Sequence, residues 1–192
     1  MISRLVITFL ALASAMPAGA QQVSDSTAFL NAVRDRNGGT ATRLLETGGS
    51  TVIGARDGQG DTALHIAIRR RDAGWVGFLI GHGADPNLPT RGGEPPLVTA
   101  AQLGFVDGVQ SLLRARANPN GANRRGETPL IAAVQARSLP VVQLLMRAGA
   151  DPNRTDSAAG YSALDYARQD RRSANILRAL ETRPAQVKTG AQ

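Results

Sequence analysis

Few residues of this sequence have the types and spacing that catalysis or metal binding requires. There are two histidines, His65 and His82, and no cysteine, so thiolate ligands and disulfides are excluded. His82 has no partner at metal-ligand spacing, and one histidine cannot complete a zinc site. Neither a G-x-S-x-G nucleophile elbow nor a phosphate-binding loop with its Lys and Ser/Thr occurs. We therefore predict no metal, no cofactor and no enzymatic activity.

Three acidic residues, Asp61, Glu94 and Glu127, are separated by a constant interval of 33 residues in the sequence. A pair of carboxyl groups that exchanges protons with a substrate must converge on one cleft. Equal spacing instead places each residue on a successive structural unit. We interpret these three residues as an acidic row along a surface, not as a catalytic pair.

The same interval appears in several other series, and it indicates the elements that position these residues. Asp85-Pro86-Asn87 recurs as Asn118-Pro119-Asn120 and as Asp151-Pro152-Asn153. Glycines at 60, 93 and 126, leucines at 64, 97 and 130, and alanines at 67, 100 and 133 follow the same interval. A period in this range predicts a stack of similar units, each of which buries its apolar side against its neighbours.

The repeated segments resemble ankyrin repeats. Thr62-Ala63-Leu64-His65 and Thr128-Pro129-Leu130 look like the opening of such a repeat, and 83–87 and 149–153 resemble its closing Gly-Ala-Asp-Val-Asn with Pro for Val. The resemblance extends over about residues 26–181. It implies an all-α ankyrin-repeat solenoid of about five helix-turn-helix units with β-turn or hairpin tips.

Local chemistry agrees with this resemblance. Thr62 and Thr128 can cap the helices that follow them, and Pro129 suits a first helical turn because its missing N–H has no partner there. Gly83 and Gly149 stand just beyond a helix, where a left-handed conformation is needed.

We divide the repeat domain, residues 21–181, into five units. Their approximate bounds are 26–55, 56–89, 90–122, 123–153 and 154–181. The first lacks the opening turn motif, and the last has an extra residue in its loop and the polar Arg171, Arg172 and Asn175. Terminal units must face water on one side, so both departures are typical of end caps.

The two ends of the chain differ in composition from the repeats. Residues 1–20 combine Arg4, an apolar run and a closing Ala18-Gly19-Ala20, which is the pattern of a cleaved secretory signal. The apolar run is shorter than the roughly 20 residues of a spanning helix, so we expect no stable membrane insertion. We predict a periplasmic protein, with residues 182–192 as a disordered tail.

The resemblance also assigns roles to single residues. It implies that His65 connects the turns of adjacent units through hydrogen bonds. Trp75 lies beside Val76 and Leu79 at helical spacing, and we expect it in the core.

The resemblance places partner contacts at the tips and at the ends of the first helices. Arginines and acids are adjacent on several tips, and this predicts a surface of mixed charge. The predicted partner-binding residues are Arg69, Arg70, Arg91, Glu94, Gln102, Leu103, Arg124, Arg125, Glu127, Gln135, Tyr161 and Gln169.

Three functions are compatible with these features. The first is a periplasmic protein-binding scaffold or accessory protein, as in small exported bacterial ankyrin-repeat proteins, some of which support an enzyme such as a catalase. The second is an inhibitor or immunity-type protein whose acidic row meets basic groups of a toxin or hydrolase. The third is a binder of an anionic polymer, suggested by the formal net charge of +7. Nucleic acid is not expected, because acids interrupt the arginines, and we expect a monomer.

The third unit is predicted to be the least stable. Pro95-Pro96 replaces Thr-Pro, Val98 replaces the histidine, and Gly108 and Ser111 leave little apolar bulk in the second helix. Each unit of a linear stack is held only by its neighbours, so amides of residues 95–115 should exchange with deuterium earliest. Uniform protection across the repeats would contradict this.

Overall fold

The computed structural model describes residues 18–182. The signal sequence predicted for residues 1–20 lies almost wholly outside this range, and the tail predicted for 182–192 lies outside it from residue 183. The first helix begins at Ala18, so it includes the predicted cleavage position after Ala20.

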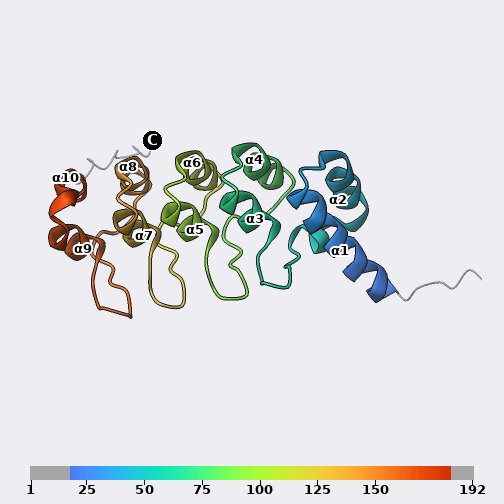
Figure 1. The fold of residues 1–192 in the computed structure, drawn as a ribbon, viewed down its shortest axis with the longest axis horizontal. Coiled ribbons are helices and arrows are strands. Elements are labelled where there is room, and N and C mark those ends of the chain that lie inside the picture. The colour runs from blue at the N-terminus through green and yellow to red at the C-terminus, as the bar shows by residue number, and fades with distance from the viewer. Residues whose placement is uncertain (1–17, 183–192) are drawn as a thin grey trace, which may run out of the picture.

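The described residues form ten α-helices in five antiparallel pairs. The pairs are α1 (Ala18–Arg34) with α2 (Gly38–Ile53), α3 (Ala63–Arg69) with α4 (Ala73–Gly81), α5 (Pro96–Gln102) with α6 (Val106–Arg114), α7 (Pro129–Gln135) with α8 (Leu139–Arg147), and α9 (Ala163–Gln169) with α10 (Ala174–Glu181). A short 3-10 turn, η1 (Arg171–Ser173), joins the last two helices. First helices make one layer and second helices the other, and the connecting tips extend from the first layer in one direction (Figure 1). The predicted all-α repeat solenoid is confirmed.

The first helices of the second, fourth and fifth units begin at hydroxyl caps. The side chains of Thr62 and Thr128 accept hydrogen bonds from the backbone N–H of His65 and Ile131, as predicted. Ser162 forms a reciprocal capping box with Asp165. In the third unit Pro95 stands at the cap and makes no side-chain cap bond.

The core lies between the two helix layers. Leu64, Leu97 and Leu130 of the first helices meet Leu79, Leu112 and Leu145 of the second, and all are buried. Trp75 was predicted to lie in the core, but it lies at the edge of the core and is only partly buried. Its ring packs edge-on against Phe78, with 5.0 Å between the ring centroids.

Gly108 does not leave the second helix of the third unit short of apolar bulk, as the sequence suggested. A Cβ built on Gly108 would lie 2.3 Å from the Phe105 ring, and Phe105 is buried. The aromatic ring therefore occupies the space that a side chain at 108 would need.

The loops between first and second helices contain a feature that the sequence analysis did not predict. Arg36 and Arg137 adopt left-handed φ angles of 57° and 53°, which few residues other than glycine favour. From there each reaches the next unit, with Arg36 Nε 2.8 Å from Asp72 and Arg137 Nε 2.7 Å from Asp170. The hydrogen bond from Arg137 lowers the pKa of Asp170 to about 2.

The same link is present after the second unit and missing after the third. Arg71, with φ 54°, donates to the carbonyl oxygen of Leu103 at 2.8 Å. The equivalent residue of the third unit is Gly104, with φ 58° and no side chain. This loop therefore connects the third unit to the fourth without an arginine.

The tips stack closely on one another. The backbone N–H of Arg91 donates to the Gly60 carbonyl at 2.9 Å, and that of Ser157 donates to the Arg125 carbonyl at 2.8 Å. Gly60 has a φ of 88°, and a Cβ there would lie 2.5 Å from Cβ of Arg91. Both the turn and the approach of the next tip therefore require glycine.

We expect Gly60→Ala to lower the free energy of unfolding by about 1–3 kcal/mol, since the new methyl group meets both a left-handed backbone and the next tip. Gly58→Ala in the same tip is the matched control, because no atom lies within 4 Å of a Cβ there. Urea unfolding of both variants measures the difference. Equal stability of the two variants would contradict the stacking of tips.

Candidate functional site

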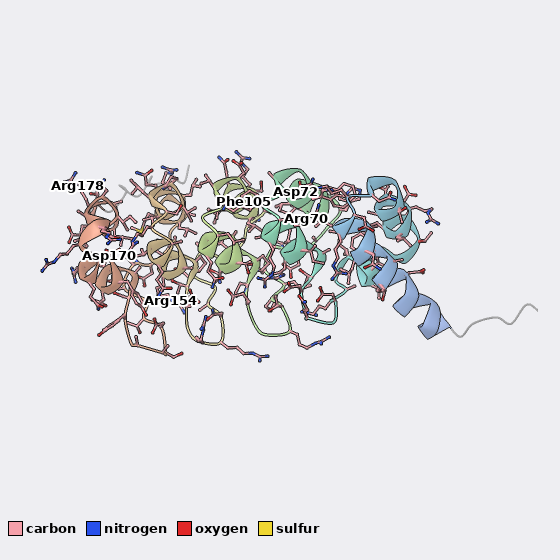
Figure 2. The ribbon with its side chains drawn as sticks, in the orientation of Figure 1. Arg70, Asp72, Phe105, Arg154, Asp170 and Arg178 are labelled. Carbon is pink, nitrogen blue, oxygen red and sulfur yellow. The ribbon has the colours of Figure 1, made fainter. Side chains whose placement is uncertain are left out.

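We define the tip-side face as the four tips together with the first helices beneath them. The tips are residues 56–62, 89–95, 122–128 and 155–162, and the helices, each with the residue that follows it, are α3, α5, α7 and α9. Figure 2 shows side chains extending from this face, with Arg154 at the chain segment that enters the last tip.

Each tip is closed by the side chain of its first turn residue. Asp57 Oδ1 accepts the N–H groups of residues 59 and 61, and Thr90 Oγ1 accepts that of Glu94 at 3.1 Å. Asn123 Oδ1 accepts the N–H groups of residues 125 and 127, and Asp156 Oδ1 those of residues 158–160. Such side chains stabilise turns by satisfying backbone donors.

The predicted acidic row is not an open surface. Asp61 is 7% exposed and Glu127 is 8% exposed. Asp61 accepts from Arg69 Nε at 2.8 Å, and Glu127 accepts from the Asn123 amide at 2.9 Å. The expectation of exposed carboxylates at these two positions was wrong, because each is engaged by neighbouring donors at the base of its tip.

Glu94 links the second tip to the third. Its Oε2 atom accepts from the Asn123 amide nitrogen at 2.9 Å. Its Oε1 atom is buried and has no hydrogen-bond partner among the described residues. The residue as a whole is only partly buried.

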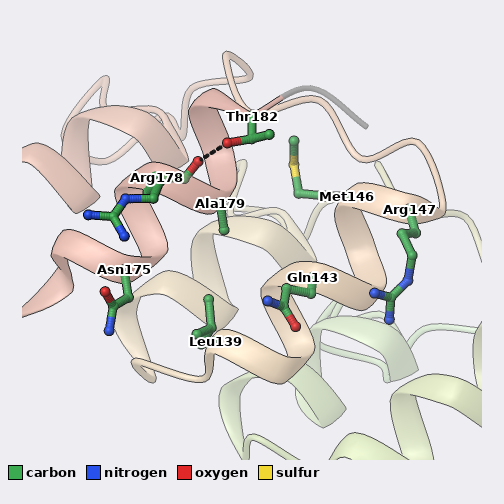
Figure 3. Close-up of a pocket in the computed structure, with 8 residues that line it drawn as sticks. All are labelled: Leu139, Gln143, Met146, Arg147, Asn175, Arg178, Ala179 and Thr182. Carbon is green, nitrogen blue, oxygen red and sulfur yellow. Dashed lines mark hydrogen bonds between the residues drawn. The ribbon is translucent and has the colours of Figure 1, made fainter. Parts of the chain in front are cut away.

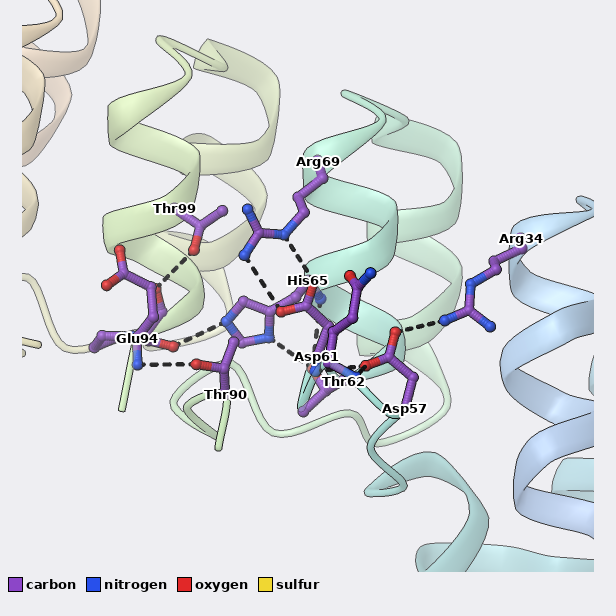
Figure 4. A network of polar contacts seen from close by, with 11 residues as sticks. Arg34, Asp57, Asp61, Thr62, His65, Arg69, Thr90, Glu94 and Thr99 are labelled. Atoms are coloured by element: carbon purple, nitrogen blue, oxygen red, sulfur yellow. Dashed lines mark hydrogen bonds and ion pairs between the residues drawn. The ribbon is translucent and has the colours of Figure 1, made fainter. Parts of the chain in front are cut away.

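His65 connects adjacent units, as the resemblance implied (Figure 4). Its Nε2 atom lies 3.0 Å from the backbone carbonyl oxygen of Glu94, which can only accept, so Nε2 carries the proton. Its Nδ1 atom is then the acceptor for the Thr62 hydroxyl at 2.8 Å. Burial lowers the pKa of His65 to about 4, although the bond to Glu94 and the charge of Asp61 act in the opposite direction.

Three predicted arginines are exposed on neighbouring tips. Arg91, Arg124 and Arg125 all reach solvent. Arg124 donates to the carbonyl oxygen of Arg91 at 2.9 Å, and Arg125 lies 3.3 Å from Glu127. These contacts leave most of the guanidinium N–H groups facing outward.

Arg70 differs from the other predicted arginines. It is partly buried, and its guanidinium donates to the carbonyl oxygens of Val33, at 2.9 Å, and of Arg34. These two oxygens lie in the last turn of α1, so Arg70 satisfies helix-end acceptors and ties the second unit to the first.

The helix ends complete the face. Gln102, Gln135 and Gln169 are exposed, and so are Leu103, at 37%, and Tyr161, at 41%. All five were predicted to contact a partner, and all five belong to the tip-side face.

Tyr166 is a residue of this face that the sequence analysis missed. Its hydroxyl donates to Asp156 Oδ2 at 2.6 Å, and its ring packs edge-on against Tyr161 at 5.6 Å. Burial raises the pKa of Asp156, but the bonds from Tyr166 and three backbone N–H groups outweigh it and lower the pKa overall. No periodic signal marks this pair, because the last loop has an extra residue.

A hollow of about 410 Å³ opens between the second and third tips, beside the ends of α3 and α5. It is lined by Arg69, Gly92, Glu94, Gln102, Asn123, Arg124 and Arg125. A larger hollow of about 590 Å³ lies elsewhere, between α8 and α10 (Figure 3). Only the first contains predicted partner-binding residues, so we treat it as the candidate site.

Among residues 18–182, no group of three or more potential ligands is arranged to hold a metal ion. Within the same range, none of the helices has the length and apolar character needed to cross a membrane.

Comparison with known families identifies the repeats. Residues 73–156 and 97–188 match the family described as ankyrin repeats in three copies. The chain belongs to the ankyrin-repeat family. Ankyrin repeats generally act as protein-interaction scaffolds and typically have no enzymatic activity. A search of curated proteins gave no match.

The stability of this protein depends on pH because the ankyrin fold buries the His65 side chain. The pKa of this group is lower in the folded than in the unfolded chain, so the unfolded chain binds more protons between about pH 4 and 6.5. Unfolding free energy should therefore be about 2 kcal/mol lower at pH 5 than at pH 7.5. Denaturant titrations at both pH values measure this.

His65→Val is the matched control, since valine occupies the equivalent position 98 of the third unit. In this variant the unfolding free energy should differ much less between pH 5 and pH 7.5 than it does in the wild type. A wild-type protein equally stable at pH 5 and 7.5 would contradict the buried neutral imidazole.

Proposed function

We propose that this ankyrin-repeat protein is a periplasmic scaffold or accessory protein that holds another protein against its tip-side face. The observation that carries this proposal is the position of two apolar side chains. Among the residues from 25 to 182 whose side chains the structure describes, Leu103 and Tyr161 are the large hydrophobic residues in the exposed class, and both belong to the tip-side face. Exposed apolar groups ringed by polar ones are typical of protein interfaces.

The neighbours of these residues support the same conclusion. Gln102 and Gln135 offer amides that can donate and accept, and Arg124 and Arg125 offer guanidinium groups. Arginine and tyrosine are enriched among residues that dominate binding energy. None of these side chains is required to fill the core.

The periplasmic location rests on residues 1–20, whose pattern is that of a cleaved signal. Cell fractionation with an antibody against residues 21–181 tests it. Recovery of a shortened chain from the periplasm supports export, and recovery of the full-length chain from the cytoplasm refutes it.

The inhibitor alternative has less support from the structure. It relied on an acidic row that would meet basic groups, and Asp61 and Glu127 are buried. Measuring the activity of an enzyme partner with and without this protein separates the two roles, because an accessory protein raises that activity and an inhibitor lowers it.

Photo-crosslinking in the source cells tests the binding face directly. A photoreactive amino acid at Gln102 or Gln135 should give the same covalent protein adduct. Gln143 on α8, which is exposed and lines the other hollow, is the control and should not. An adduct from Gln143 alone, or from none of the three positions, would overturn the proposal.

Arg124→Ala combined with Arg125→Ala should reduce adduct formation at Gln102 by about tenfold, because interface arginines are often dominant contacts. The thermal midpoint should stay unchanged, since both side chains are exposed. Arg171→Ala with Arg172→Ala removes the same charge from the end cap and should not affect the adduct. If only this second pair mattered, the face would be wrongly assigned.

A further inference from the structure

Basic and acidic side chains of the tip-side face lie at different depths. All of its tip and helix-end arginines except Arg70 fall in the exposed class. They include Arg56, Arg69, Arg91, Arg124, Arg125 and Arg168. The seven acidic residues of the same segments are all buried or partly buried, and they are Asp57, Asp61, Glu94, Glu127, Asp156, Asp165 and Asp170.

The acids are withdrawn because the fold uses them. Asp57 and Asp156 accept backbone N–H groups inside their own tips. Asp61 and Glu127 are held at the bases of the tips, as described above. The Asp165 side chain is 41% exposed, but it closes the capping box with Ser162 and lies 3.9 Å from Arg168.

Acidic side chains of the exposed class occur elsewhere in the molecule. In the described part of the chain they lie on the second helices and in the loops that flank them. They are Asp35, Glu46, Asp85, Asp107, Asp151 and Glu181. Charge is therefore sorted by position, although the sequence mixes both signs along its length.

Several outward guanidinium groups are available to a ligand. The side chains of Arg91 and Arg154 have no hydrogen-bond or ion-pair partner among residues 18–182. Arg124 uses one nitrogen on the Arg91 carbonyl. A guanidinium carries five N–H donors in a planar fork that matches a carboxylate. Arg124 and Arg125 line the 410 Å³ hollow, and Arg91 precedes Gly92, which also lines it.

We propose that the partner inserts an acidic segment, with aspartate or glutamate side chains, across the second and third tips. This inference rests on the proposed function and specifies the chemistry of the partner. Carboxylates of the segment pair with Arg91, Arg124 and Arg125. Its apolar side chains contact Leu103, and its backbone meets the amide of Gln102.

A protein segment fits this surface better than an anionic polymer does. Polymers with repeated phosphate or sulfate groups favour a continuous basic stripe. Here the glutamines and Leu103 interrupt the arginines. Such an arrangement suits a ligand that alternates charged, polar and apolar groups.

Fluorescence anisotropy with a labelled peptide of glutamates and leucines tests the inference on the full chain. The matched probe has glutamine in place of each glutamate, and heparin represents a polyanion. We expect the glutamate peptide to bind about tenfold more tightly than the glutamine peptide. Arg91→Ala with Arg124→Ala should abolish this preference. Arg114→Ala with Arg147→Ala, which removes the same charge from exposed positions on α6 and α8, should preserve it.

Equal binding of the two peptides would overturn the inference. Equal losses of the preference for the glutamate peptide in both double variants would also overturn it. So would heparin that binds more tightly than the glutamate peptide and is weakened by both double variants. The protein that crosslinks at Gln102 adds an independent result: its crosslinked peptide should be acidic. A neutral or basic peptide would refute the acidic segment while leaving the binding function intact, whereas the absence of an adduct would refute the function.

Discussion

The whole structure depends on the contact between successive tips. Each unit has only two short helices, which cannot bury an apolar face alone, so the units must align in register along the stack. The glycine at position 60 allows the next tip to approach its backbone, and the bond from Arg91 N–H to the Gly60 carbonyl sets the register. His65 adds a partly buried hydrogen bond across the same junction.

This constraint also determines which charges the protein presents. A tip that stacks against its neighbour has backbone donors that need acceptors, and Asp57, Asn123 and Asp156 supply them. Carboxylates at the bases of the tips hold arginines and amides in place. On the tip-side face the acids therefore lie inward and the long arginine side chains outward, so this face is more basic than its composition indicates.

The sequence was sufficient to predict the repeat, its register and most local signals. Helix caps at Thr62 and Thr128, the glycine after α4 and the bridging role of His65 follow from residue type and period. Such features are local or recur at one interval, so a single sequence reveals them.

Depth and side-chain direction were harder to predict. Glu127 accepts from Gln102 of the preceding unit, and Arg70 donates to the Val33 carbonyl of the first unit, so the directions of these side chains depend on contacts between units. Asp61 is instead held by Arg69 of its own unit. A long side chain can point toward solvent or fold back on a neighbour from the same position. Periodicity indicates the position and cannot decide between these directions.

Carboxyl labelling with a carbodiimide and glycine ethyl ester, read by mass spectrometry on the folded protein, tests the central claim most directly. The account predicts slow labelling of Asp61, Glu127 and Asp156 and fast labelling of Glu46, Asp107 and Asp151. Labelling of the first group as fast as the second would show that the acids face solvent, and the inward placement of carboxylates described here would be wrong.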